Sequence, residues 1–283
     1  MKLISFLNQG VPSYGVVNGD DVLDLPPILG AQAPDLKTLI AKNLFGAVAE
    51  ATKTHKPTLK FSQLTLQPVI PNPGQIFCIG LNYGEHVLET GREVTEVPTI
   101  FLRLADSQVA HGQDIMRPPE SHRLDYEAEI AVIIGKGGRR IQEEDAWDHI
   151  AGYSCYNDGS VRDWQVATSQ WTPGKNFYKT GGFGPWMVTS DEIAPAQVIR
   201  LQTVLNGQVL QDTTTDKMIH SIPRQIAYIS TFIPLSPGDV IVTGTPGGVG
   251  NKRTPQIFMK PGDVCEIVVD AIGTLRNGIR DDA

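Results

Sequence analysis

Two glutamates are spaced so that both carboxylates can leave one face of a strand. Glu127 and Glu129 lead into an apolar run, 130–134, that predicts a buried strand. Because side chains alternate along a strand, the two carboxylates project to the same side, about 7 Å apart. Burying two anions costs several kcal/mol unless a cation compensates them, so a divalent metal is one explanation. A polar strand end that faces solvent explains the same spacing.

A third carboxylate, Asp158, stands at a loop-to-helix transition within Asn157-Asp158-Gly159. If the fold brings it to the two glutamates, the set offers only oxygen ligands, with no imidazole or thiolate. Such a set suits Mg²⁺ or Mn²⁺ rather than Zn²⁺. The alternative is a turn that merely caps a helix.

His86 and Glu89 form a candidate acid-base pair. In a helix over 83–90 they would be i, i+3 neighbours on one face. A carboxylate in that position can orient an imidazole and stabilise its charge while the imidazole acts as a general base. A solvated surface pair is the alternative.

Lys175 and a glycine-rich run are the remaining candidates for a functional site. Lys175 ends the loop Trp171-Thr172-Pro173-Gly174-Lys175, and the run TGTPGGVG, 243–250, follows an apolar segment. The run is neither a Walker loop nor a dinucleotide fingerprint. Its glycines would let backbone amides and Thr245 approach a ligand carboxylate. The alternatives are a solvated loop lysine and a plain turn between strands.

The elements that must position these residues are mainly strands. Short apolar or β-branched runs bounded by turn residues predict strands over 76–79, 99–102, 130–134, 187–189, 201–205, 240–243 and 264–269. Asn206-Gly207 predicts a hairpin. Helices are few, and the periodicity predicts them over 83–90, 143–150 and 221–232. The expected class is α+β, mainly β.

The first 70 residues predict a small separate module. It holds a strand from Leu3, two short strands around the turn Asn18-Gly19-Asp20, and a helix over 36–52. A connector follows that contains Pro57, Pro68, Pro71 and Pro73, and proline resists both helix and central strand. We therefore predict two domains, 1–70 and 71–283.

Composition excludes several classes of partner. The chain of 283 residues carries 24 basic and 31 acidic residues, for a net charge of −7. That balance argues against nucleic acids and anionic membrane surfaces as partners. No secretory signal or transmembrane run is recognised, so we predict a cytoplasmic protein. The three cysteines show no Cys-x-x-Cys, which argues against a disulfide framework and a thiolate metal site.

Taken in order, these segments resemble the fumarylacetoacetate hydrolase family, including the small N-terminal module of its longer bacterial members. The matching blocks run from Gln75 onward: Gly80-Leu81-Asn82-Tyr83 with His86 and Glu89, Asp125-Tyr126-Glu127-Ala128-Glu129, Gly152-Tyr153 with Asn157-Asp158, Arg162-Asp163 with Gln165, Lys175, Gly184-Pro185-Trp186, and 243–250. The resemblance implies a mixed β-sandwich roll with few covering helices and a small N-terminal α/β module. It also implies a metal-dependent enzyme, usually a homodimer, that acts on 2-oxo acids.

The resemblance also implies roles for single residues. It assigns Mg²⁺, with Mn²⁺ as an alternative, to Glu127, Glu129 and Asp158. His86 and Glu89 would activate water, and Lys175 would stabilise developing negative charge. The contacts to the 2-oxo acid end would come from Arg162, Gln165 and Thr245. Two departures from the family pattern are Arg103, where many relatives have lysine, and Tyr178, which stands in place of an aspartate and is expected to face the substrate tail.

The first functional hypothesis is a hydrolase that cleaves the C–C bond of a 2,4-diketo acid, of acylpyruvate or fumarylpyruvate type, in the catabolism of aromatic compounds. It would release pyruvate and a carboxylic acid, and the acyl group is left open. The alternative on the same site is an oxaloacetate decarboxylase or a 2-oxo acid enol-keto tautomerase or isomerase. The third hypothesis is a metal-stabilised binding protein without turnover.

Overall fold

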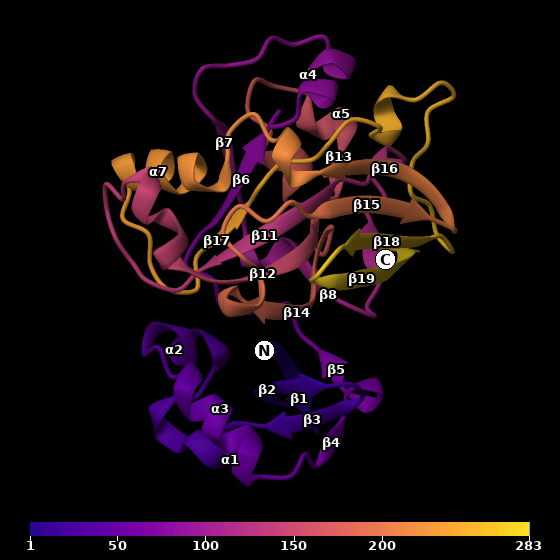
Figure 1. Cartoon of the computed structure of the whole chain (residues 1–283). Coiled ribbons are helices and arrows are strands. Elements are labelled where there is room, and N and C mark those ends of the chain that lie inside the picture. The colour runs from indigo at the N-terminus through magenta and orange to yellow at the C-terminus, as the bar shows by residue number, and fades with distance from the viewer. Residues whose placement is uncertain (283) are drawn as a thin grey trace.

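The computed structural model describes residues 1–282. A large sheet runs through most of the molecule (Figure 1). Its strands are ordered β4-β3-β2-β1-β14-β12-β11-β17-β6-β7, and β5 and β8 pair with β1 and β14. The strands of this sheet that follow residue 75 are β6 (Ile76–Gly80), β7 (Thr99–Arg103), β8 (Gln108–Ala110), β11 (Ala128–Ile134), β12 (Ile150–Asn157), β14 (Gly181–Thr189) and β17 (Val240–Val242). The predicted α+β, mainly β class is confirmed.

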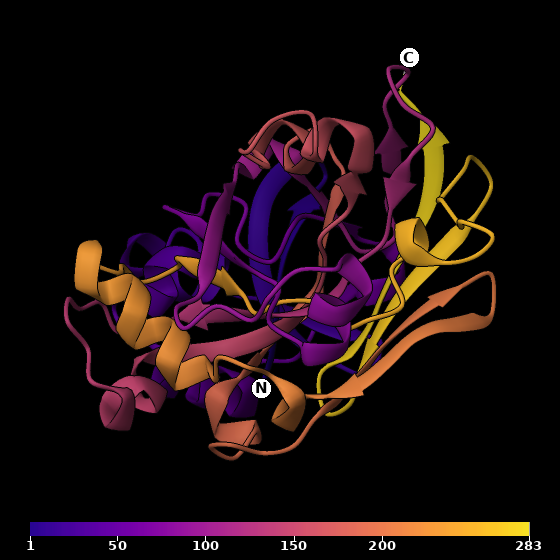
Figure 2. The same ribbon diagram turned by 90° about the horizontal axis from the view of Figure 1, so that it is seen from above.

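A second sheet of five strands packs beside the first and is ordered β16-β15-β18-β19-β9. From above, its orange and yellow strands lie at one side of the molecule and α7 lies at the opposite side (Figure 2). Its strands are β9 (Ile115–Arg117), β15 (Arg200–Leu205), β16 (Gln208–Thr214), β18 (Val264–Val269) and β19 (Gly273–Asp281). The hairpin predicted at Asn206-Gly207 joins β15 to β16 and is confirmed. A two-stranded ribbon is formed by β10 (Leu124–Asp125) and β13 (Ser160–Val161).

The helices that follow residue 75 are short. The α-helices of this part are α4 (Gly84–Thr90), α5 (Arg162–Gln165), α6 (Thr172–Lys175) and α7 (Ile222–Phe232). The helix predicted over 143–150 is instead a 3₁₀ helix, η4 (Glu143–His149). Other 3₁₀ turns are η1 (Gly30–Gln32), η2 (Phe61–Gln63), η3 (Ala105–Ser107), η5 (Ser190–Glu192), η6 (Thr215–Lys217) and η7 (Gly250–Lys252). Within residues 1–282, no helix is long and apolar enough to cross a membrane.

The N-terminal segment contributes strands to the main sheet. Its elements are β1 (Lys2–Asn8), β2 (Val11–Asn18), β3 (Asp21–Asp24), β4 (Leu59–Lys60), β5 (Thr65–Leu66), α1 (Pro26–Leu29), α2 (Leu36–Ala41) and α3 (Phe45–Thr54). β1 pairs antiparallel with β14, with Leu3 opposite Met187. One hydrophobic cluster therefore contains residues of both parts, including Leu3, Met187 and Val242. The domain boundary near residue 70 stays a prediction.

The single helix predicted over 36–52 is wrong, because two helices occupy this stretch. Asn43 lies between them with φ of 51°, a left-handed conformation that interrupts the helical path. Asp35 caps α2 by accepting a hydrogen bond from Thr38 N at 2.6 Å. The strands predicted beyond Gln75 are all present. The strand predicted over 187–189 is the last part of β14, which begins at Gly181, and the others lie close to their expected bounds.

The pairing of β11 with β12 positions the carboxylates. Ala128 lies opposite Asn157, so Glu127 and Asp158 meet just beyond the paired ends. Asp158 N donates to Glu127 O at 2.9 Å and joins the two chain segments there. All residues of both strands are buried, and the Glu129 side chain therefore lies inside the protein. In Figure 1, α4 and α5 lie together at the end of the molecule remote from the N-terminal elements.

Candidate metal-dependent active site

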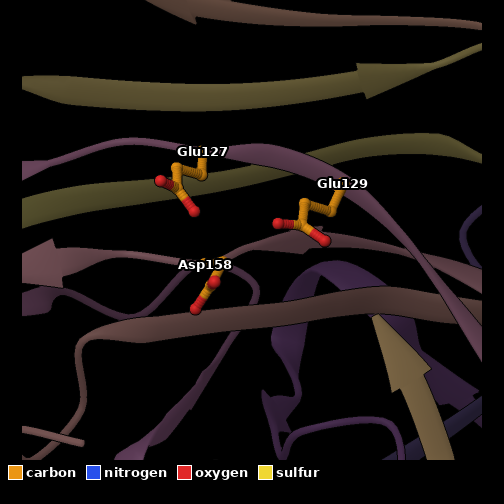
Figure 3. A group of neighbouring side chains, drawn as sticks. All are labelled: Glu127, Glu129 and Asp158. Atoms are coloured by element: carbon orange, nitrogen blue, oxygen red, sulfur yellow. The ribbon is translucent and has the colours of Figure 1, made fainter. Parts of the chain in front are cut away.

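Three carboxylates converge where β11 begins and β12 ends (Figure 3). Glu127, Glu129 and Asp158 each offer an oxygen, and these atoms all lie within 4.8 Å of one another. Their residues are at most 3% exposed. The predicted convergence of the two strand glutamates with Asp158 is therefore present, and the solvent-facing strand end is excluded.

The three carboxylates are unequally compensated. Lys175 Nζ lies 2.7 Å from Glu127 Oε2 and 2.6 Å from Asp158 Oδ2. Arg162 Nη1 adds a contact of 2.7 Å to Glu127 Oε1. Glu129 takes part in no ion pair among residues 1–282, and it accepts one hydrogen bond, from Gly244 N at 2.5 Å. A buried anion without a cation is unfavourable, so an all-oxygen set with one uncompensated member fits a divalent metal such as Mg²⁺ or Mn²⁺.

The pKa values of these residues reflect the unequal compensation of the carboxylates by cations. Burial would raise the pKa of Glu127, but the cations of Lys175 and Arg162 outweigh burial and lower that pKa below its ordinary value. For Glu129, burial and the charges of Asp158 and Glu127 act together and raise its pKa well above the ordinary value. Burial opposes the charge of Lys175, yet Asp158 and Glu127 raise its pKa overall, so its side chain stays cationic.

His86 and Glu89 form the expected pair on α4. His86 Nδ1 lies 2.7 Å from Glu89 Oε1. The other carboxylate oxygen of Glu89 accepts from Gly248 N at 2.8 Å, so the glycine-rich run fixes the carboxylate that orients the imidazole. His86 is buried and lines the same cavity as Glu127 and Glu129. Because Nδ1 is engaged, Nε2 is the ring nitrogen left for a ligand.

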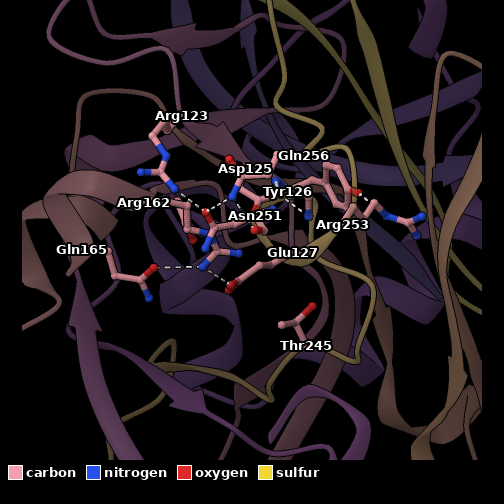
Figure 4. A network of polar contacts seen from close by, with 12 residues as sticks. Arg123, Asp125, Tyr126, Glu127, Arg162, Gln165, Thr245, Asn251, Arg253 and Gln256 are labelled. Carbon is pink, nitrogen blue, oxygen red and sulfur yellow. Dashed lines mark hydrogen bonds and ion pairs between the residues drawn. The ribbon is translucent and has the colours of Figure 1, made fainter. Parts of the chain in front are cut away.

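A cavity of about 140 Å³ contains most of the predicted site. Its lining includes His86, Glu127, Glu129, Arg162, Gln165, Lys175 and Thr245. Figure 4 shows the network around Arg162, whose Nε donates to Asp125 Oδ2 at 2.8 Å and whose Nη1 donates to Gln165 Oε1 at 2.9 Å. Nη2 of Arg162 is buried and has no partner among the described residues. This free donor is suited to a ligand carboxylate.

Close packing of α5 against α6 places Lys175 in the cluster. A Cβ atom on Gly174 would lie 2.2 Å from Gln165 N, so only glycine permits this approach. Thr245 lines the cavity, and its Oγ1 accepts from Gln211 Nε2 at 2.9 Å. Tyr178 is not brought to the cavity: it is 53% exposed and contacts Lys179, whose Nζ lies 5.2 Å from its ring centroid.

Two further residues, Arg103 and Asp125, lie in the site although no role for them follows from the sequence patterns. Arg103 is buried and donates from Nη1 to Asp158 Oδ1 at 2.5 Å. Asp125 accepts from Arg162, Gly250 N and Asn251 N, and so it ties the glycine-rich run to β10. The signals in the sequence were the arginine in place of lysine in the strand over 99–103 and the first acid of DYEAE.

A larger cavity lies elsewhere and has a different character. It measures about 260 Å³, and its mostly apolar lining includes Ile130, Trp147, Tyr153, Met218 and Ile222. None of the predicted site residues lines it. Convergent polar groups and perturbed pKa values mark the smaller cavity as the active-site candidate.

Known proteins resemble the chain in sequence over nearly its whole length. Residues 75–280 match the family described as fumarylacetoacetate (FAA) hydrolase, C-terminal. The mitochondrial oxaloacetate tautomerase of Xenopus laevis is 36% identical over 288 residues, which cover 99% of this chain and 90% of that protein. A mitochondrial oxaloacetate tautomerase of Bos taurus is 36% identical over 291 residues, 99% of this chain and 91% of that protein.

Solved structures agree with the fold. A putative HpcE protein from Mycobacterium smegmatis superposes with a TM-score of 0.90 at 32% identity, and both chains are covered completely. A maleylpyruvate hydrolase from Sphingobium, solved with manganese(II) and pyruvate, gives a TM-score of 0.83 at 28% identity, again with complete coverage of both chains. The similar proteins thus include tautomerases as well as a hydrolase.

Proposed function

The chain belongs to the fumarylacetoacetate hydrolase family, and we propose that it catalyses the enol-keto tautomerisation of oxaloacetate with a divalent metal held by Glu127, Glu129 and Asp158. The observation that carries the proposal is one oriented base, His86, in a small cavity that two of the three converging carboxylates, Glu127 and Glu129, also line. The resemblance to oxaloacetate tautomerases over nearly the whole chain supports the choice of reaction.

The reaction moves one proton between C3 and the oxygen on C2. A bound divalent metal would hold the 1-carboxylate and polarise the 2-oxo group. In the enol-to-keto direction, which the assay follows, the proton of the C2 hydroxyl is released to solvent and protonated His86 delivers a proton from Nε2 to C3. In the reverse direction His86 Nε2 takes the proton from C3 and solvent protonates the C2 oxygen. Glu89 holds Nδ1 and stabilises the imidazolium in both directions. The ammonium group of Lys175 stabilises negative charge that develops at the C2 oxygen. The unpartnered Nη2 of Arg162 binds the 1-carboxylate.

The size of the cavity supports a small substrate. Its volume of about 140 Å³ lies below the roughly 300–1,000 Å³ of pockets that take drug-sized ligands. A four-carbon acid matches such a space better than a long acylpyruvate does. Keto-enol tautomerisation also requires a base that exchanges a proton with C3, but it requires no attacking water. His86 is sufficient as that base.

The test follows the disappearance of enol-oxaloacetate by ultraviolet absorbance with Mg²⁺, with Mn²⁺ and with excess chelator. We expect turnover with either metal, loss of turnover in chelator, and loss in Glu127→Ala. Arg139→Gln, an exposed arginine outside the cavity, serves as the matched control. Full turnover in chelator would contradict the proposal.

Hydrolysis of a 2,4-diketo acid is the second candidate, and the His86 and Glu89 pair favours it because such a pair can also activate water. The resemblance to a maleylpyruvate hydrolase adds support. Pyruvate release from a panel of 2,4-diketo acids, compared with enol-oxaloacetate turnover on the same enzyme, ranks the two reactions. Release of carbon dioxide from oxaloacetate tests decarboxylation in the same series.

Further properties belong to the proposal as well. We propose Mg²⁺ as the metal, with Mn²⁺ as the alternative, and metal analysis of the purified protein tests both. The homodimer implied by the family is tested by light scattering on the eluted protein. A cytoplasmic location is tested by cell fractionation, which matters because the tautomerase relatives are named mitochondrial.

A further inference from the structure

We propose that Arg92 binds the distal carboxylate of the substrate and thereby selects 2-oxo dicarboxylic acids over monocarboxylic ones. This inference rests on the proposed function, because it names the substrate class of the same site. Arg92 lines the cavity together with His86 and Arg162, although the sequence patterns assigned it no role. Three observations carry the inference: the anchoring of Arg92, the ring beneath its guanidinium, and its unused donors.

The backbone of Arg92 is tied to the helix that carries the base. Gly91 ends α4 in the left-handed conformation, with φ of 69°, a turn that favours glycine. Arg92 N then donates to Val87 O at 3.2 Å. The position of Arg92 relative to His86 is therefore set by α4 itself.

An aromatic ring orients the guanidinium. Cζ of Arg92 lies 5.0 Å from the ring centroid of Trp171, a distance typical of a cation over a ring face. Trp171 packs edge-on against Phe101 with centroids 5.5 Å apart, and Lys175 Nζ lies 4.9 Å from the Phe101 centroid. Two stacked contacts to rings thus connect Lys175 with Arg92: the lysine lies over Phe101, Phe101 packs against Trp171, and Arg92 lies over Trp171.

The ring of Trp171 is packed against the main chain at Gly80 as well as against Phe101. A Cβ atom on Gly80 would lie 2.4 Å from Cζ3 of Trp171, so the indole sits directly against the backbone at the end of β6. The Arg92 guanidinium lies over this ring. Attraction between a cation and a ring forms no N–H···O hydrogen bond, so the N–H groups of Arg92 remain available for a carboxylate.

The donors of Arg92 are unused within the protein. Among residues 1–282 its side chain makes no hydrogen bond and no ion pair, whereas Arg162 is engaged by Asp125, Glu127 and Gln165. The cavity therefore has one arginine fixed beside the metal ligands and a second, oriented and unpaired, at its mouth. A substrate with a carboxylate at each end matches both.

Two alternatives compete with this role for Arg92: it is only a hydrated surface residue, or another cation binds the distal carboxylate. Arg92 is exposed, and exposed arginines are commonly only hydrated. Lys252 also lines the cavity and is exposed. Arg92 is favoured because its position is set by α4 and Trp171, and because a guanidinium can bind a carboxylate through two hydrogen bonds.

The experiment uses two unreactive 2-hydroxy acids, L-malate and L-lactate, which differ by the distal carboxylate. Their dissociation constants are measured by calorimetry on the Mg²⁺-loaded full chain for the wild type, Arg92→Gln, Arg92→Lys, Lys252→Gln and the control Arg139→Gln. We expect the wild type and the control to bind malate about tenfold to a hundredfold more tightly than lactate, the range of one charge-assisted hydrogen bond. Arg92→Gln should lose this preference while its affinity for lactate and its thermal melting stay unchanged, and Arg92→Lys should retain part of it.

Several outcomes would overturn the inference. Equal or undetectable binding of the two acids by the wild type removes it, and so does a preference that persists in Arg92→Gln. Loss of the preference in Lys252→Gln alone assigns the role to Lys252. The proposed function is judged separately: a protein that does not tautomerise oxaloacetate, yet loses its malate preference in Arg92→Gln, contradicts the reaction and supports the role of Arg92.

Discussion

Arg103 Nη1 lies 2.5 Å from Asp158 Oδ1, and neither side chain has exposed surface. The same nitrogen donates to Gly159 O at 3.0 Å, and Nη2 donates to Thr180 Oγ1 at 2.9 Å. The other oxygen of Asp158 accepts from Lys175 at 2.6 Å. Asp158 is thus held through both oxygens before any metal binds, which gives the cluster a fixed geometry.

Removing the charge of Arg103 should destabilise the protein strongly. Arg103→Met leaves Asp158 with one buried cation in place of two, and breaking a buried pair in this way costs about 3–5 kcal/mol. We expect a loss of this size in the free energy of unfolding, measured with urea. Arg103→Lys keeps the charge but cannot reach Asp158, Gly159 and Thr180 together, so its loss should be smaller. Equal stability of Arg103→Met and the wild type would show that the pair is not structural.

Replacing His86 should remove catalysis and leave the fold intact. His86→Gln keeps the size of the side chain but cannot act as a base, and general-base catalysis contributes about 10²–10⁴-fold. We expect kcat for enol-oxaloacetate to fall within this range, with an unchanged circular dichroism spectrum and unchanged metal affinity. Glu89→Gln should lose less, because the imidazole remains. An unchanged kcat in His86→Gln would rule the residue out as the base.

The pH dependence of the free energy of unfolding should report the ionisation of Glu129. Burial and the charges of Asp158 and Glu127 raise its pKa in the fold above the ordinary value of 4.5. A group of this kind adds stability that is present below its unfolded pKa and is lost as pH rises through its folded pKa. In chelator, therefore, the wild type should lose stability toward alkaline pH relative to Glu129→Gln.

The comparison uses urea unfolding at mildly acidic and mildly alkaline pH. We expect Glu129→Gln to be the more stable protein at alkaline pH by at least about 1 kcal/mol, since one pKa unit is worth about 1.4 kcal/mol. Saturating Mg²⁺ should reverse the order, because the wild type binds the ion and the variant binds it weakly. A wild type that exceeds the variant in chelator at both pH values would contradict this account.

A substitution at Gly80 tests whether Trp171, which lines the cavity, shapes the site. In Gly80→Ala the new methyl group would lie 2.4 Å from Trp171 Cζ3, so the indole has to shift. Overpacking of this kind costs about 1–3 kcal/mol, and displacement of Trp171 should raise KM for oxaloacetate more than it lowers kcat. Gly84→Ala is the control, because a Cβ there meets nothing within 4 Å. Matched kinetics in the two variants would mean that Trp171 does not shape the site.

Local patterns were sufficient for the carboxylate face and for most strands. Glu127 and Glu129 share a face because a strand alternates its side chains, and this geometry holds whatever surrounds the strand. The hairpin at Asn206-Gly207 and the pair His86 and Glu89 are equally local, since each depends on residues within a few positions. The break between α2 and α3 escaped prediction because the helical period continues past Asn43.

The sequence by itself determined which side chains could act together within one element: two glutamates on a strand, a histidine and a glutamate on a helix. Only the tertiary structure decided which elements meet. Arg103 reaches Asp158 across 55 residues of sequence, Arg92 lies over Trp171, and Tyr178 is exposed and does not line the cavity. The physical reason is the separation of the residues along the sequence. Periodicity shows which side chains share one face of a helix or strand, whereas contacts between distant segments depend on how the whole core packs.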